Sequence, residues 1–137
     1  MAEQQVPNLE QMDERQAHHF LADLFSRLSA EAEHQIRHED YTMEWPQSGE
    51  RLRGRQKMRE FQEANAGSRP TRWVRRVVVR EGLWVVEGSV DYGGGREGDF
   101  VLILEMREGR IFKETRYYAD RLGASEARAR WFERMER

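Results

Sequence analysis

Apolar side chains recur every three or four residues in the first third of the chain. Over residues 9–28 the recurring positions are Ala17, Phe20, Leu21, Leu24, Phe25 and Leu28, and charged residues occupy the opposite face. This spacing predicts an amphipathic helix that packs on a core. Ser29 can cap a second, shorter helix over residues 30–38. A third helical pattern covers residues 55–65.

The second half of the chain has the composition and the alternation of strands. Segments rich in Val, Ile, Trp, Phe and Tyr cover residues 73–80, 83–90, 100–106 and 110–118. The breaks at 81–82 and 107–109 are short enough for tight hairpins. These segments therefore predict an antiparallel meander.

Two shorter patterns complete the order of elements. "YTMEW" (41–45) has strand character and ends at Pro46, and "RLRG" (51–54) can return beside it. "SEARARWFERMER" (125–137) predicts a C-terminal helix with Ser125 as its cap. Helices followed by a run of strands predict an α+β fold, in which a curved antiparallel sheet wraps around the first helix and leaves an open cone.

The length of 137 residues suits one domain with one hydrophobic core. Residues 1–8 have no periodicity and contain Pro7, so we expect a flexible N-terminus before a single domain over residues 9–137.

The composition of the chain excludes several kinds of binding partner and several kinds of catalytic site. Basic and acidic residues number 23 and 25, are mixed along the chain and give a net charge of -2, which offers no electrostatic footprint for nucleic acid. No segment approaches the roughly 18 consecutive apolar residues of a membrane span. The absence of cysteine excludes disulfides, thiolate catalysis and Cys-based zinc sites, and fits a cytoplasmic location. "GGGREG" is not followed by the lysine of a phosphate loop, and we expect no cofactor.

Two segments carry a resemblance to a known superfamily. "MEWPQSGERLRG" (43–54), followed by a short helix, and "GRIFKETRYYAD" (109–120) on the last strand resemble the nuclear transport factor 2-like superfamily and, within it, the SnoaL-like polyketide cyclase and ketosteroid isomerase-like group. The resemblance covers residues 10–136. It implies a cone-shaped curved antiparallel sheet packed on N-terminal helices, the cystatin-like α+β barrel. Because this superfamily contains isomerases, cyclases, dehydratases, hydrolases and non-catalytic binders, it implies no single reaction.

The resemblance also bears on the chemistry. In ketosteroid isomerase a catalytic aspartate precedes the proline at the end of the first strand, and Trp45 matches that position here. The strand that carries the second acid of that enzyme is apolar here, near Val101 and Leu102. Both acids of that design are missing, which argues against steroid isomerisation by the same means.

The last strand supplies the leading acid/base candidate. Alternation places Phe112, Glu114, Arg116 and Tyr118 on one face, and the resemblance turns that face towards the cone. Glu114 is the candidate because an acid on this part of the sheet works as acid/base in the polyketide cyclases that the chain resembles. Burial would raise the pKa of Glu114 and the Arg116 guanidinium would lower it. The alternative is an internal Glu–Arg pair that only fixes the register of the sheet.

Two other residues are candidate proton carriers. Asp120 follows the last strand and lies either at the mouth of the cone or in the next loop. His18 borders the apolar stripe of the first helix and points either into the cone or to its solvent edge. His34 and His38 have a zinc-like spacing on the expected second helix, but no third ligand is evident and we expect no metal.

Aromatic residues predict the pocket wall. Tyr41 and Trp45 share one face of their strand, so Trp45 faces the cavity and Glu44 faces away unless the strand bulges. The hydroxyl of Tyr118 can hydrogen-bond a ligand carbonyl or any buried partner. The expected pocket residues are Phe20, Tyr41, Trp45, Phe112, Arg116 and Tyr118.

Three functions fit this sequence, and whether the protein is an enzyme is left open. It can be a cofactor-free isomerase, cyclase or dehydratase that works by general acid/base catalysis, a non-catalytic binder of a small apolar molecule, or a structural dimeric module with a filled cone. Segments 77–79 and 100–104 are apolar on both faces, so we expect a second copy to cover the outer face in a homodimer through the sheet.

Overall fold

The computed structural model describes residues 6–136, so residues 1–5 of the expected N-terminal segment lie outside the described part. The helices are η1 (Leu9–Gln11), α1 (Glu14–Arg27), α2 (Ala30–Gln35), α3 (Arg55–Ala64), η2 (Ala66–Ser68) and η3 (Glu126–Arg128). The strands are β1 (Arg37–Trp45), β2 (Glu50–Arg53), β3 (Thr71–Arg80), β4 (Leu83–Gly93), β5 (Arg96–Arg107) and β6 (Arg110–Asp120). None of the described helices is both long and apolar enough to cross a membrane.

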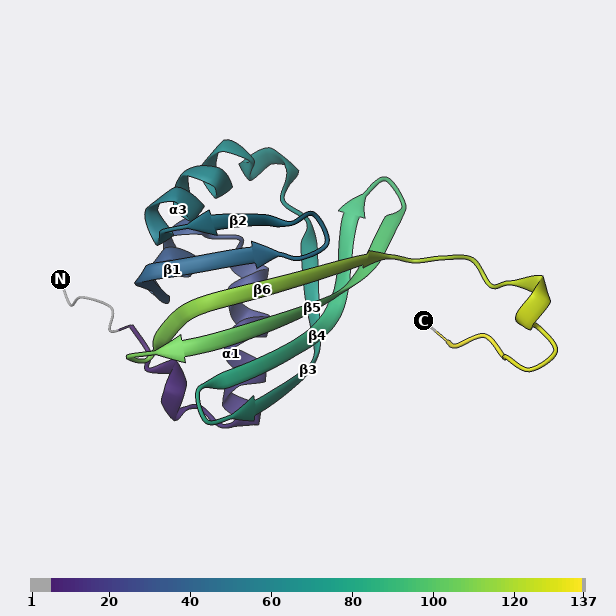
Figure 1. Cartoon of the computed structure of the whole chain (residues 1–137), viewed down its shortest axis with the longest axis horizontal. Coiled ribbons are helices and arrows are strands. Elements are labelled where there is room, and N and C mark those ends of the chain that lie inside the picture. Colours follow the sequence, from purple (N-terminus) through teal and green to yellow (C-terminus); the bar gives the residue numbers. More distant parts are fainter. Residues whose placement is uncertain (1–5, 137) are drawn as a thin grey trace.

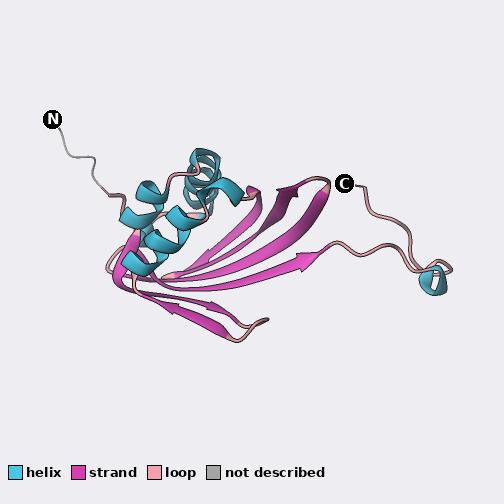
Figure 2. Cartoon of the chain, turned by 90° about the horizontal axis from the view of Figure 1, so that it is seen from above, coloured by secondary structure: helices cyan, strands magenta, loops and turns pink. Residues whose placement is uncertain are grey.

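The strands form one curved sheet in the order β2-β1-β6-β5-β4-β3 (Figure 1). The helices α1, α2 and α3 gather against one face, and the strands curve away from them (Figure 2). The predicted α+β fold with a curved sheet is therefore confirmed. Two details differ. Strands β1 and β6 run parallel, and the edge strands β2 and β3 each pair with one neighbour but not with each other, so the sheet does not close into a barrel.

Helix α1 begins at a reciprocal cap. The backbone N–H of Gln16 donates to the Asp13 carboxylate at 2.8 Å, and the backbone N–H of Asp13 donates to the Gln16 side chain at 3.0 Å. The buried side of the helix carries Ala17, Leu21 and Phe25, and the helix lies mainly over β3. The predicted amphipathic pattern thus packs on the inner face of the sheet.

Two Glu-Gly turns close the tight hairpins that the sequence predicts. Glu81 and Gly82 join β3 to β4, and Glu108 and Gly109 join β5 to β6; all four have positive φ, the pattern of a type I′ turn. The backbone N–H of Gly109 also donates to the Glu10 carboxylate at 2.6 Å. The turn between β5 and β6 is therefore tied to the start of the folded chain.

The expected position of Phe112 is wrong because β6 contains a β-bulge at this residue. Glu105 of β5 pairs with Lys113 and Met106 pairs with Ile111, so Phe112 has no partner on β5 and the alternation is reset. Its ring lies edge-on to His38, with centroids 5.6 Å apart. Phe112 therefore does not share the strand face of Glu114, Arg116 and Tyr118, as the alternation predicted, and it does not line the pocket described below.

The prediction of a C-terminal helix over residues 125–137 is also wrong over its described part, residues 125–136. Only the short turn η3 forms there, and the segment after Asp120 runs away from the sheet (Figure 1). Trp131, Phe132 and Met135 are exposed, with 73% of Trp131 accessible. An amphipathic segment of this length is marginal without a surface that covers its apolar stripe, and the domain offers none here.

Candidate functional site

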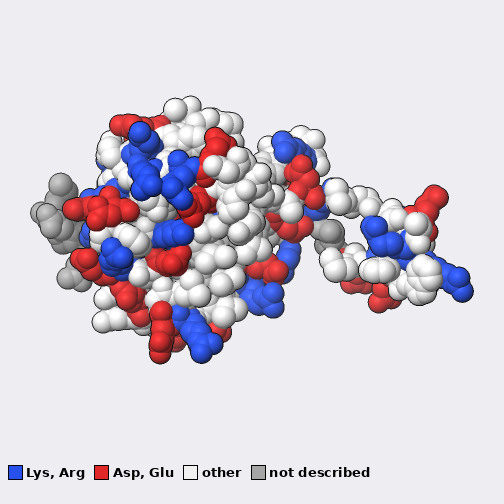
Figure 3. Space-filling view, in the orientation of Figure 1, with Lys and Arg blue, Asp and Glu red and all other residues white. Residues whose placement is uncertain are grey.

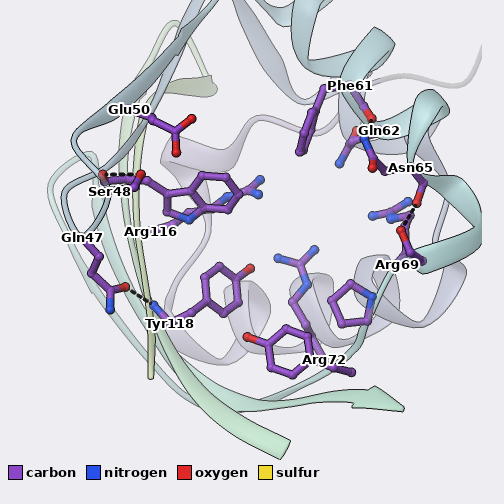
Figure 4. A pocket seen from close by; sticks show the side chains of 14 residues that line it. Gln47, Ser48, Glu50, Phe61, Gln62, Asn65, Arg69, Arg72, Arg116 and Tyr118 are labelled. Atoms are coloured by element: carbon purple, nitrogen blue, oxygen red, sulfur yellow. Dashed lines mark hydrogen bonds between the residues drawn. The ribbon is translucent and has the colours of Figure 1, made fainter. Parts of the chain in front are cut away.

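A hollow of about 580 Å³ opens on the inner side of the sheet (Figure 4). Its walls come from the turn between β1 and β2, from α3 and the turn after it, and from β3, β4 and β6. The walls combine the rings of Trp45, Phe61, Tyr92 and Tyr118 with nine polar or charged side chains, although apolar atoms make up most of the wall surface. This volume and mixture are typical of small-molecule sites.

The rings come from separate elements and meet edge to face. The Trp45 ring lies 6.5 Å from Phe61 of α3 at an interplanar angle of 82°, and 6.4 Å from Tyr118 of β6 at 69°. Trp45 faces the hollow as the alternation of β1 predicts. Glu44 lies on the outer face, where its carboxylate accepts a hydrogen bond from Arg51 at 2.7 Å.

Glu114 lies behind the hollow and is buried. The Tyr41 hydroxyl donates to its Oε1 at 2.6 Å, and the Arg116 Nε donates to its Oε2 at 2.6 Å. Arg116 and Tyr118 line the hollow, whereas Glu114 and Tyr41 do not. The turn opposite is held to β6 because the Tyr118 backbone N–H donates to the Gln47 side chain at 2.7 Å.

These partners decide the ionisation of Glu114. Burial by itself would raise its pKa, but the Arg116 and Arg37 guanidiniums, with hydrogen bonds from Arg116 and Tyr41, lower that pKa to about 2. Burial and the neighbouring carboxylate raise the pKa of Tyr41 above its usual value. Glu114 is therefore an ionised hydrogen-bond acceptor at neutral pH, and a weak base.

One solved structure decides the family. An NTF2-like protein of unknown function from Burkholderia xenovorans LB400 is 31% identical to this chain, superposes with a TM-score of 0.76, and the match covers 89% of this chain and 94% of that one. The chain belongs to the NTF2-like family. This result confirms the superfamily inferred from the sequence.

Other solved structures are less similar in sequence to this NTF2-like chain, and they show only that the fold is shared. A protein with a cystatin-like fold from Silicibacter pomeroyi DSS-3 is 15% identical with a TM-score of 0.62, covering 72% of this chain and 70% of that one. A steroid delta-isomerase from Pseudomonas aeruginosa is 16% identical with a TM-score of 0.61, covering 74% and 77%. No family model matches the chain, and no curated protein matches it.

The sequence analysis missed a second buried carboxylate in this NTF2-like fold. Glu33 of α2 forms ion pairs with Arg69, with Arg72 at 3.4 Å and with Arg37 at 3.8 Å. The Arg72 guanidinium also lies 3.9 Å from the centroid of the Phe25 ring. The only sequence signal was the thin apolar stripe of α2, whose buried side holds this carboxylate.

The other sequence candidates lie away from the hollow. His18 and Phe20 line a separate groove where α1 meets β3. Asp120 is exposed at the end of β6, 3.5 Å from Arg96. His34 is in α2 whereas His38 is in β1, so the helical spacing assumed for a metal pair does not hold. No cluster of His, Asp and Glu suited to a metal occurs within residues 6–136.

We expect Glu114 to make the stability of the fold depend on pH in the acid range. Its pKa is about 2 in the folded chain and near the ordinary 4.5 when unfolded. Its ionised form therefore stabilises the fold fully above about pH 5, and this contribution is lost as the pH falls towards 2. Urea unfolding of the wild type and Glu114→Gln at several pH values measures it. The difference between the two proteins should shrink in acid, and a constant difference would contradict the assignment.

Proposed function

We propose that this protein binds a small, mostly apolar molecule in the hollow between Trp45, Phe61 and Tyr118. The observation that carries the proposal is the open volume of about 580 Å³ between rings that come from different elements. Apolar walls with a few polar groups provide affinity through burial and orientation through hydrogen bonds. The fold shared with other NTF2-like proteins is compatible with such a role and specifies no ligand.

Cofactor-free isomerase, cyclase or dehydratase chemistry is the second candidate. In its favour, the Tyr118 hydroxyl and the Arg116 guanidinium belong to residues that line the hollow beside its aromatic rings. Against it, Glu114 lies behind the hollow with a pKa of about 2, and a base of such low pKa removes protons poorly. We therefore place binding first. Catalytic roles for Glu114, Asp120 and His18, the lack of a cofactor and a cytoplasmic location stay predictions.

Replacing Trp45 by alanine should weaken ligand binding by about tenfold to thirtyfold, because a buried indole is a typical binding hot spot. The measurement is a thermal-shift screen of small aromatic and alicyclic compounds, followed by calorimetric titration of the best one. Trp73→Ala is the matched control, since Trp73 is 53% exposed and does not line the hollow.

Two outcomes of this screen would change the proposal. Equal affinity of the wild type and Trp45→Ala for every compound would contradict binding in this hollow. Conversion of a bound compound by the wild type, with binding but no conversion in Glu114→Gln or Asp120→Asn, would favour the enzyme.

We also propose a homodimer through the outer face of the sheet. Trp73, Val78, Leu83 and Tyr117 are exposed, and the pairing register puts them on the face opposite the buried residues. Figure 3 shows a broad area without charged side chains on the face of the sheet turned away from α1. Apolar areas of this kind commonly mark interfaces, and two-fold pairs are the commonest oligomers.

Light scattering at micromolar concentration should give a dimer for the wild type and a monomer for Val78→Lys combined with Tyr117→Lys. Both side chains are exposed in the single chain, so the change should cost the monomer little stability. Phe132→Lys in the exposed C-terminal segment is the control and should stay dimeric. A monomeric wild type would overturn the proposal.

A further inference from the structure

The charged part of the cavity wall is mostly guanidinium, because three of the four charged residues that line it are arginines. Arg69 precedes β3, Arg72 lies on β3 and Arg116 lies on β6, and all three line the cavity. Figure 4 shows the Arg72 side chain reaching from β3 towards the middle of the hollow. Of the described residues around the cavity, Glu50 is the only acidic one, and it is exposed to solvent.

The buried charges behind these arginines do not balance. Their side chains, together with that of Arg37, are between 3% and 13% exposed. The carboxylates paired with them are equally buried. Four guanidiniums against two carboxylates leave an excess of two positive charges; the six residues are Arg37, Arg69, Arg72, Arg116, Glu33 and Glu114.

Donor groups are also left over at the cavity wall. Among the described residues, Arg116 donates a hydrogen bond only through Nε, to Glu114, and its two terminal nitrogens have no such partner. Arg72 reaches Glu33 through one terminal nitrogen at 3.4 Å. A guanidinium has five N–H donors, and the unpaired donors of Arg72 and Arg116 keep some exposure at the cavity wall. An anion in the hollow would supply the hydrogen-bond acceptors and the negative charge that this network of arginines and carboxylates lacks.

We propose that the ligand of this hollow is a small apolar carboxylic acid, bound as its carboxylate. This inference rests on the proposed binding function. The aromatic or alicyclic body lies between Trp45, Phe61 and Tyr118, and the carboxylate accepts hydrogen bonds from Arg72 and Arg116. Planar guanidiniums match the two oxygens of a carboxylate, and hydrogen bonds between charged groups are about twice as strong as neutral ones. Apolar walls around the ion pair reduce its screening by water.

Matched pairs of ligands test the charge requirement. Calorimetric titration at neutral pH compares benzoate, cyclohexanecarboxylate and 2-naphthoate with the corresponding amides, which keep the same body and lose the charge. We expect each acid to bind at least tenfold more tightly than its amide, and this preference to fall as salt is raised. The wild-type measurement stands whether or not any variant folds.

Variants locate the preference in the hollow. Arg72→Gln should reduce the acid-to-amide ratio below about threefold and leave the affinity for the amide nearly unchanged, because only the carboxylate contact is lost. Arg69→Gln is a second variant should Arg72→Gln not fold, and it should also reduce the ratio because it removes another positive charge from the wall of the hollow. Arg75→Gln is the matched control, since Arg75 lies on the same strand but pairs with Ser89 and Asp99 outside the hollow.

The outcomes separate this inference from the proposed function. If the amides bind as tightly as the acids, or more tightly, the hollow is a binding site and the carboxylate inference is overturned. If the acids are preferred equally by Arg72→Gln, Arg69→Gln and the wild type, the anion lies elsewhere and the inference is again overturned. If neither the acids nor the amides nor any compound of the wider screen binds, both the inference and the proposed function fail.

Discussion

Glu114→Gln is expected to lower the free energy of unfolding by about 3–5 kcal/mol, the usual loss when one partner of a buried ion pair is removed. Glutamine keeps the shape and can still accept the hydrogen bond from Tyr41. It cannot balance the Arg116 guanidinium, which donates to Glu114 at 2.6 Å. The buried network would then hold four guanidiniums and one carboxylate.

Urea unfolding at pH 7, followed by circular dichroism, measures this loss. Glu44→Gln is the matched control, because Glu44 lies on the same sheet and also has two cationic partners, Arg51 and Lys113, but faces outwards. Its replacement should change the stability little, since exposed ion pairs are screened by water. Equal losses for the two variants would mean that the burial of Glu114 has no energetic consequence.

Gly88→Ala is expected to destabilise the fold by about 3 kcal/mol, at the upper end of the usual cost of overpacking. A β-carbon at Gly88 would lie 2.0 Å from the Trp73 carbonyl oxygen and 2.6 Å from the Phe100 ring. The register of β3 shifts beside this point, between Val74 and Arg76. The glycine therefore lets a bulged edge strand and an aromatic ring approach β4 from two sides.

The same change should disturb the hollow. The Phe100 ring lies 6.2 Å from the Tyr118 ring, so displacing Phe100 moves a support of the pocket wall. Gly67→Ala is the control, because a β-carbon there would meet no atom within 4 Å and the backbone needs no positive φ. Thermal unfolding of both variants measures the effect. Equal stability of Gly88→Ala and Gly67→Ala would contradict this close packing.

Periodicity predicted the helices and strands because each of these elements buries one face. At the site, the direction of individual side chains could be predicted only on β1 and β6, from the alternation of each strand. Trp45 and Tyr118 were placed correctly by alternation. Phe112 was not, because a bulge adds one residue to one strand and leaves no mark in the local pattern. The C-terminal segment has an amphipathic pattern without a surface to pack on, and a pattern alone does not form a helix.

Alternation on β6 predicted the pair of Glu114 and Arg116, but the rest of the charged part of the site could not be predicted from the sequence. Glu33 and Arg72 are 39 residues apart, and they meet only because α2 packs near the start of β3. Glu114 was expected to face the cone and does lie on the inner face of β6. Its neighbours Tyr41 and Arg116 enclose it, and this depends on the curvature of the sheet.

The central claim is that the hollow beside Trp45 holds a small molecule, and the indole N–H signals of the four tryptophans test it most directly. Titration with 2-naphthoate or its amide, whichever binds more tightly, is followed in proton–nitrogen correlation spectra assigned with Trp→Phe variants. We expect the Trp45 signal to move while those of buried Trp84, outer-face Trp73 and C-terminal Trp131 stay in place. Movement of the Trp73 signal with Trp45 unchanged would place the ligand on the outer face and contradict the account.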